Sequence, residues 1–256
     1  MKIKRIIQKS LNTLGYELRR HRPNRKGLSL DQYPICDMVS FLEAVKLRGW
    51  SCNNIMDVGA HRADWSRMAQ GVFPNSKFCL IEPLREMEEH LISFCKDFQD
   101  STYILKGVGA KKNIKTLTLG KRLDGSSFVP EIGSPYFAEN EKRIIDVITI
   151  DSLLHSMTTP MPDIIKLDIQ GYELEALKGA TKTFGHTELF ILEVSLYPFY
   201  GKENPVLHEV IQFMLERDYL VYDLAGFLRK PINGTLAQLD ICFVKKEGIL
   251  YKKTKQ

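Results

Sequence analysis

Acidic side chains end several apolar segments of this 256-residue chain. Asp57 stands near the end of the first such segment, with Gly59 just after it, and Glu82 follows the second. Asp168 and Glu193 end two later segments. If these segments are parallel strands, their carboxyl ends meet at one edge of a sheet, where open α/β sheets bind ligands. The spacing therefore predicts one polar binding site made of strand ends.

The turn after the first segment, in MDVGAHRADWS, holds a single glycine. Gly59 lets a ligand approach the backbone, and the helix expected next presents free N–H groups. Ala60 and His61 share this turn and are candidate ligand contacts. The chain lacks the G-x-G-x-x-G pattern that admits a pyrophosphate and the GK[ST] of a P-loop. The turn is a weak signal by itself, but it disfavours both of those phosphate-binding classes.

Glu82 adds a more specific signal. A carboxylate 25 residues after Asp57, at the end of a second strand, can accept two hydrogen bonds from a ribose diol. Pro83 stops the strand and directs the carboxylate outward. A ribose contact without a phosphate grip indicates S-adenosylmethionine rather than a nicotinamide dinucleotide, and Asp57 could then serve the methionine ammonium. Two plainer interpretations stay open: Asp57 as a cap of the glycine turn, and Glu82 as a surface acid.

The segment IIKLDIQGYELEALKGA carries the second group of candidates. Asp168 closes an apolar strand, Gly171 permits a tight exit, and Glu173 falls in the first turn of the next helix, where an acid is favoured. A carboxylate beside a sulfonium would have an electrostatic role. Glu173 is therefore a candidate catalytic residue, and the alternative is that it only caps its helix.

Methyl transfer from a sulfonium needs alignment and exclusion of water more than chemical activation. An alcohol acceptor would also gain from a general base. Asp168 is one candidate base, and His61 is another because of its titration range. Asp168 and Glu193 could instead share a divalent ion through oxygen ligands, an alternative that we do not favour.

The elements that would position these residues alternate between strand and helix. Several predicted strands are apolar nearly throughout, which is typical of central parallel strands covered on both faces. The alternation predicts a doubly wound sheet with right-handed crossovers. The expected strands are 54–60, 77–83, 102–109, 163–169, 188–194, 218–224 and 240–246, and the expected helices are 37–49, 63–73, 84–98, 172–184 and 204–217. Residues 116–120 and 143–150 predict a β-ribbon.

Charge is concentrated at the N-terminus. Residues 1–26 carry nine Lys or Arg against Glu17, which leaves the rest of the chain at a net charge of −3. We therefore expect no nucleic-acid partner. Residues 1–34 predict a basic amphipathic helical arm and a linker, and the arm either docks on the body or lies on a membrane surface or partner. Five cysteines without a CxxC pair favour a reducing cytoplasm over a disulfide framework or zinc site.

Taken together, these motifs resemble those of the FkbM-type methyltransferases, over roughly residues 50–245 and most specifically over 163–180. The resemblance implies a Rossmann-like, seven-stranded class I methyltransferase fold with its last strand antiparallel, S-adenosylmethionine as cofactor, and O-methylation of a sugar, glycan or natural product. It would place Asp57, Gly59 and Glu82 at the cofactor, and residues 168–173 at the reacting centre. The family usually has GANxG where this chain has His61 and Ala63, and often Glu where Gln170 stands.

We assign residues 35–256 to the methyltransferase domain. Its insertion at about 120–142 is rich in Gly, Ser and aromatic residues, as a lid over a sugar would be. Tyr197, Phe199 and Tyr200 follow Glu193 and are candidate acceptor contacts, or a packed aromatic turn. Alternatives are an acceptor nitrogen or carbon and a non-catalytic member that binds a nucleoside or a partner. The acceptor is expected to be a small molecule or glycan, and a homo-oligomer stays open.

Overall fold

The computed structural model describes residues 29–121, 123–130, 137–155, 159–198, 201–230 and 233–255. The chain consists of two units, Met1–Tyr33 and Pro34–Gln256. In the first unit the described part holds one short 3-10 helix, Leu30–Gln32, and the predicted arm helix lies outside the described residues. Within the described part of the chain, every helix is too short or too polar to cross a membrane.

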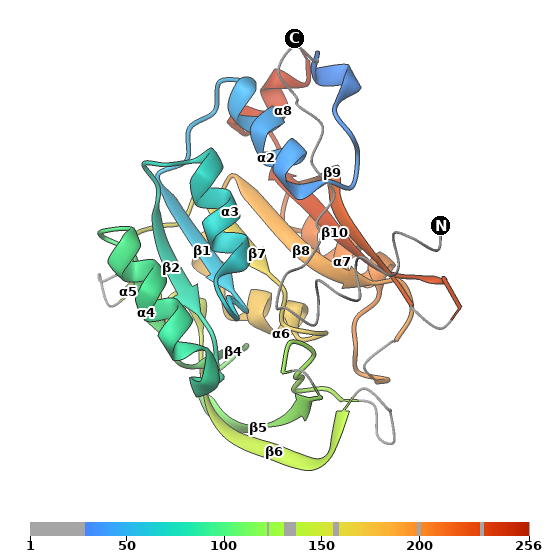
Figure 1. Cartoon of the computed structure of the whole chain (residues 1–256). Coiled ribbons are helices and arrows are strands. Elements are labelled where there is room, and N and C mark those ends of the chain that lie inside the picture. The colour runs from blue at the N-terminus through green and yellow to red at the C-terminus, as the bar shows by residue number, and fades with distance from the viewer. Residues whose placement is uncertain are drawn as a thin grey trace, which may run out of the picture. The chain divides into compact units, whose positions relative to one another are not determined.

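A seven-stranded sheet forms the centre of the second unit (Figure 1). Its strands are β1 (Asn54–Val58), β2 (Lys77–Ile81), β3 (Thr102–Ile104), β7 (Ile164–Leu167), β8 (Leu189–Ser195), β9 (Tyr219–Arg229) and β10 (Leu236–Lys245). The order is β3-β2-β1-β7-β8-β10-β9, and β10 runs antiparallel to both of its neighbours. This confirms the predicted Rossmann-like fold with an antiparallel last strand. The strand order reverses between β1 and β7, the place where such sheets bind ligands.

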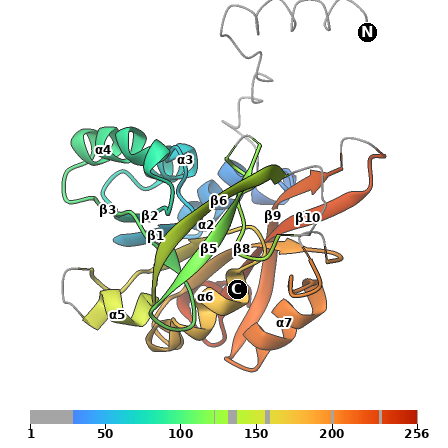
Figure 2. The same cartoon turned by 90° about the horizontal axis from the view of Figure 1, so that it is seen from below.

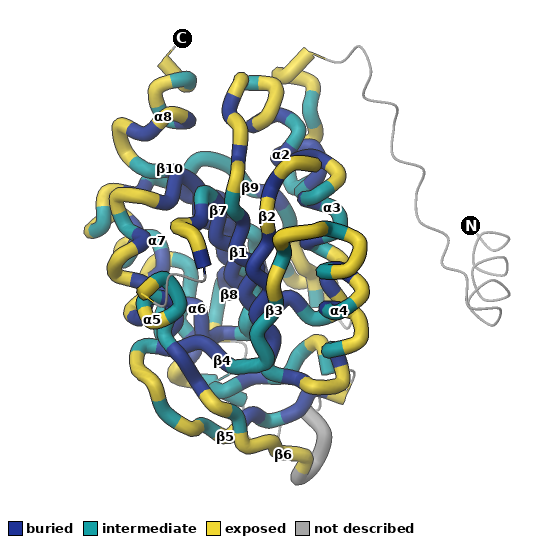
Figure 3. Tube along the Cα trace, turned by 90° about the vertical axis from the view of Figure 1, so that its left-hand side faces the viewer, coloured by how far each residue is buried: buried dark blue, intermediate teal, exposed yellow. Residues whose placement is uncertain are grey.

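Helices cover both faces of this sheet, as Figure 2 shows. One face carries α2 (Met38–Leu47), α3 (Asp64–Val72) and α4 (Glu88–Asp97), and the other carries α5 (Ile150–His155), α6 (Glu173–Lys178) and α7 (Leu207–Leu215). Each strand divides its apolar side chains between the two layers, because successive residues point to opposite faces. Ile55 packs in the first layer and Met56 in the second. The central strands β1 and β7 are accordingly buried, except for the first residue of β1 (Figure 3).

A second sheet consists of β4 (Gly107–Val108), β6 (Phe137–Ile148) and β5 (Asn113–Gly120), in that order. The prediction of one strand over 102–109 is therefore wrong, because the segment is divided between the two sheets. The expected β-ribbon is present as the antiparallel pair of β5 and β6, but β6 ends before α5. The short helix α8 (Ile249–Lys253) was not expected.

Candidate functional site

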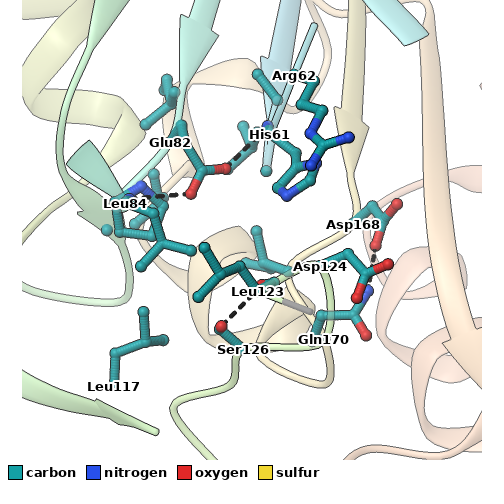
Figure 4. A pocket seen from close by; sticks show the side chains of 18 of the residues that line it. His61, Arg62, Glu82, Leu84, Leu117, Leu123, Asp124, Ser126, Asp168 and Gln170 are labelled. Carbon is teal, nitrogen blue, oxygen red and sulfur yellow. Dashed lines mark hydrogen bonds between the residues drawn. The ribbon is translucent and has the colours of Figure 1, made fainter. Parts of the chain in front are cut away.

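A pocket of about 250 Å³ opens at the carboxyl ends of β1, β2 and β7. Its lining comes from the turns after these three strands, from β4 and β5, and from the insertion that follows β5. Figure 4 shows Glu82 on one side of this pocket and Asp168 with Gln170 on the other. Of the acidic residues that the sequence analysis expected at the strand ends, Glu82 and Asp168 therefore line one pocket.

Gly59 is the point at which the turns after β1 and β7 approach most closely. Its φ is +81°, and a Cβ built on it would lie 1.9 Å from the backbone oxygen of Asp168. Only glycine combines this left-handed conformation with the missing side chain. The turn thus keeps backbone exposed at the pocket floor, where Ala60 and Pro83 also contribute to the lining as expected.

Glu82 is buried, with 4% of its surface exposed, and both of its oxygens accept backbone hydrogen bonds. The N–H of His61 donates to Oε2 at 2.9 Å and that of Leu84 donates to Oε1 at 3.0 Å. Burial raises the pKa of Glu82 to about 7, against the opposing effect of these two bonds. The two bonds hold the carboxylate rigidly at the pocket wall. Each of its oxygens can still accept a further hydrogen bond.

His61 lines the pocket in a left-handed backbone conformation, with φ of +45°. Burial and the neighbouring Arg62 lower the pKa of its imidazole, so the ring is neutral at pH 7. Its Nε2 is buried and has no hydrogen-bond partner among the described residues. Ala63 follows at φ of +58°, a left-handed conformation that glycine adopts more readily than other residues.

Asp57 is fully buried and does not line the pocket. Ser66 of α3 donates to its Oδ2 at 2.6 Å, and the ammonium of Lys166 lies 3.4 Å from its Oδ1. Asp57 therefore lies beneath the lining, on the side of β1 that faces α3. Its expected role at the cofactor stays a prediction.

Lys166 is the central residue that the sequence analysis missed. Its side chain is 9% exposed, lines the pocket, and lies 3.3 Å from Oδ2 of Asp168. Burial alone would lower the pKa of Lys166, but Asp168 and Asp57 outweigh that effect and raise it. The sequence did contain an indication of this residue, because Lys166 is the one charged residue within the apolar run IIKL. In the structure it lies in register with Asp57 on β1.

The polar row continues across the sheet to β8 and β10. Gln170 donates from Nε2 to Oδ1 of Asp168 at 2.6 Å and to Oε2 of Glu193 at 3.0 Å, and Gln238 donates to the same Glu193 oxygen at 2.7 Å. Burial, with Asp168 next, raises the pKa of Glu193 well above its usual value, and burial raises that of Asp240 to about 6. An amide donor thus bridges the two carboxylates that were considered as metal ligands. In the part of the chain that the structure describes, no cluster of three His, Cys, Asp or Glu side chains is arranged for a metal ion.

Glu173 is buried beside the pocket rather than in its lining. Its Oε1 accepts from the backbone N–H groups of Ile169 at 2.9 Å and Gly171 at 3.2 Å. Burial raises the pKa of Glu173 to about 7. The position expected for a catalytic residue is therefore occupied by a carboxyl that braces the turn carrying Gln170, which itself has φ of +57°.

The insertion after β5 closes the far side of the pocket. Its described residues are 121 and 123–130, of which Leu123, Asp124, Ser126 and Phe128 line the pocket. The hydroxyl of Ser127 donates to the backbone oxygen of Gln170 at 2.7 Å and so joins the insertion to the turn after β7. Tyr197 is outside the pocket lining, and Phe199 and Tyr200 lie outside the described residues. The lid role of the insertion stays a prediction.

Several solved methyltransferases share a general likeness with the chain. Precorrin-6y C5,15-methyltransferase from Geobacter metallireducens is 15% identical, with a TM-score of 0.44, and the match covers 84% of this chain and 95% of that one. WbdD is 14% identical, with a TM-score of 0.48, over 94% of this chain and 48% of that one. With TM-scores below 0.5, these likenesses decide nothing about this chain.

The sequence comparisons are more informative. The hexuronic acid methyltransferase AglP of Haloferax volcanii is 38% identical over 50 residues, which is 20% of this chain and 21% of AglP. The chain therefore matches only about a fifth of that relative's length. The model of the methyltransferase FkbM domain matches residues 57–221, a range that contains the whole lining of the pocket. The chain belongs to the FkbM family of methyltransferases.

Proposed function

We propose that the chain is an S-adenosylmethionine-dependent O-methyltransferase that acts on a hydroxyl of a sugar, glycan or related natural product. One observation carries the proposal: the buried carboxylate of Glu82 and the partly exposed carboxylate of Asp168 line the same pocket, at the switch point of the sheet. Such a pocket can hold a nucleoside at one end and its reactive group at the other.

In this proposal, the cofactor ribose lies against Glu82. The bonds from His61 and Leu84 use one acceptor site on each carboxylate oxygen, which leaves sites for the two ribose hydroxyls. The adenine then lies among the apolar side chains of Leu84, Val108 and Leu117. The methionine part passes over Gly59, where no side chain obstructs it.

The sulfonium would face Asp168, whose carboxylate is 32% exposed and open to the pocket. When bound, S-adenosylmethionine would supply the methyl group for an in-line displacement, in which a bond from the acceptor oxygen to the methyl carbon would form as the bond from sulfur to that carbon breaks. Asp168 would take the proton of the acceptor hydroxyl. Lys166 and Gln170 hold this carboxylate in one orientation, and such positioning is the main source of rate in a displacement of this kind.

The acceptor class is supported by two further features. Asp124 and Ser126 bring polar side chains of the insertion to the pocket, and they could hydrogen-bond sugar hydroxyls. The relative from Haloferax volcanii is a hexuronic acid methyltransferase. Neutral and acidic sugars are therefore the first acceptors to examine.

The test is transfer of a labelled methyl group from S-adenosylmethionine to saccharides with and without uronic acids, followed by NMR of the product. We expect a methyl ether on a sugar oxygen. A chelator should not reduce its formation, because the amide of Gln170 and the ammonium of Lys166 already contact the carboxylates that would otherwise bind a metal ion. An N-methyl or C-methyl product would replace the O-methyl proposal. Tight cofactor binding without transfer to any acceptor would favour a non-catalytic member of the family.

A further inference from the structure

The carboxylate of Asp168 is fixed from two sides, and one of them leads out of the pocket. Its Oδ2 lies 3.3 Å from the ammonium of Lys166, and its Oδ1 accepts the amide N–H of Gln170 at 2.6 Å (Figure 4). The same amide nitrogen also donates to Oε2 of Glu193 at 3.0 Å. Because Glu193 does not line the pocket, its influence on Asp168 passes through Gln170.

The outer end of this chain of hydrogen bonds is anchored in the sheet. Glu193 lies within β8, and Gln238 of the neighbouring strand β10 donates from Nε2 to the same oxygen, Oε2, at 2.7 Å. Donors from β10 and from the turn after β7 thus meet on one carboxyl oxygen. A carboxyl group that accepts both hydrogen bonds on Oε2 can carry a proton on Oε1, so this geometry suits the neutral acid.

The charges around Glu193 also favour its neutral form. Burial raises the pKa of Glu193 well above its usual value, and three negative neighbours add to this effect: Asp168, Glu173 and Asp240. Lys166 opposes them, but its ion pair is with Asp168 rather than with Glu193. Carboxyl groups that share a site in this way do not all ionise. The proton therefore belongs on Glu193, and Asp168 keeps its charge beside Lys166.

We propose that Glu193 is a positioning residue for methyl transfer, whose neutral carboxyl group orients the amide of Gln170 and, through it, the carboxylate of Asp168. The inference rests on the proposed function. A neutral Glu193 holds the amide without placing a second negative charge beside the base. Alignment of the reacting groups supplies much of the rate in a displacement of this kind, so loss of Glu193 should slow the chemical step and leave binding unchanged.

The first experiment compares methyl transfer by wild type, Glu193→Ala and Glu193→Gln. The acceptor is the saccharide that wild type methylates, at saturating S-adenosylmethionine. Glu193→Ala should lower kcat about tenfold or more and keep the KM of both substrates within about twofold. Glu193→Gln should recover most of the lost rate, because glutamine has the shape of a protonated carboxyl group and can present its oxygen to both amide donors.

Infrared difference spectroscopy tests the charge of Glu193 without any acceptor. A protonated carboxyl group has a C=O stretch at a frequency where neither carboxylates nor amides absorb. The spectrum of wild type minus that of Glu193→Gln, recorded at pH 7, should contain this band. Its absence would show that Glu193 is ionised, which would overturn the inference.

Glu188→Ala is the matched control, because Glu188 is another buried glutamate beside the same strand and accepts the N–H of Leu250, away from the pocket lining. It should change kcat less than twofold, even where it lowers stability. Calorimetry with S-adenosylhomocysteine checks that each variant keeps the pocket. If Glu193→Ala does not fold, Gln238→Met removes only the second donor to Oε2 and should likewise lower kcat without raising KM.

The kinetic results separate this inference from the proposed function. An unchanged kcat in Glu193→Ala, or a raised KM for the saccharide, which would mean that Glu193 binds the acceptor itself, would overturn the inference and leave the proposed function intact. If wild type transfers no methyl group to any saccharide, both are wrong.

Discussion

Replacing Glu82 by glutamine gives the sharpest prediction about the cofactor site. The change keeps the size of the side chain but turns one carboxylate oxygen into an NH₂ group. Both oxygens now accept from backbone N–H groups, His61 at 2.9 Å and Leu84 at 3.0 Å. Whichever way the amide is turned, one N–H then faces a donor and loses its partner.

The magnitude follows from these contacts. One buried N–H without an acceptor is expected to lower the free energy of unfolding by about 1–3 kcal/mol. Loss of the charge at the ribose should weaken binding of S-adenosylhomocysteine by about 1–2 kcal/mol, or roughly five- to thirty-fold in Kd. The wild-type affinity should also depend on pH. Because the pKa of Glu82 is raised to about 7, the carboxyl becomes protonated as the pH falls through 7, and binding should weaken until it reaches a limit roughly five- to thirty-fold below its value at high pH.

Calorimetry with S-adenosylhomocysteine between pH 5 and 8, on wild type and Glu82→Gln, separates these effects. The variant should bind more weakly at pH 8 and should lose most of the pH dependence. Glu86→Gln is the control, because Glu86 is exposed, pairs with Arg143 and lies outside the pocket lining. An unchanged Kd in Glu82→Gln at pH 8 would refute the assignment of Glu82 to the ribose.

Three further variants test the framework around the pocket. Gly59→Ala places a Cβ 1.9 Å from the Asp168 carbonyl at a φ of +81°, and urea unfolding should show a loss of about 3 kcal/mol or more together with lost cofactor binding; wild-type behaviour would mean that the two turns are not in contact. Lys166→Met leaves Asp57 buried without its counter-charge and should cost about 3–5 kcal/mol by the same measurement, whereas a stabilised protein would show that the ion pair of Lys166 with Asp57 contributes nothing to stability. Asp168→Asn should bind S-adenosylhomocysteine within a few-fold of wild type but slow label transfer about 100-fold or more, and full activity would remove Asp168 from the mechanism.

The sheet could be predicted from the sequence because its central strands are apolar on both faces. Runs such as FCLI and LFILEV are typical of strands buried between two layers of helices. The segment 102–109 could not be read in the same way. Its apolar character continues through Leu105, but the chain leaves the main sheet there, and β4 packs so close to Phe128 that a Cβ on Gly107 would lie 2.7 Å from its ring. Because Phe128 belongs to the insertion after β5, this contact could not be predicted from the segment 102–109 itself.

The candidate site could be predicted only in part, because a strand end fixes the place of a residue but not the direction of its side chain. Glu82 comes after the last residue of β2 and faces the pocket, whereas Asp57 lies within β1 and points toward α3. Lys166 shares that face, and period-two alternation would have found the pair. The role of Glu173 depends on the left-handed turn at Gln170, which no spacing rule indicates.

A crystal structure with S-adenosylhomocysteine bound would test the central claim most directly. We expect both ribose hydroxyls within hydrogen-bond distance of the two Glu82 oxygens, and the sulfur turned toward Asp168. A nucleoside bound anywhere else, or one that enters the pocket with its adenine at Asp168, would contradict the account.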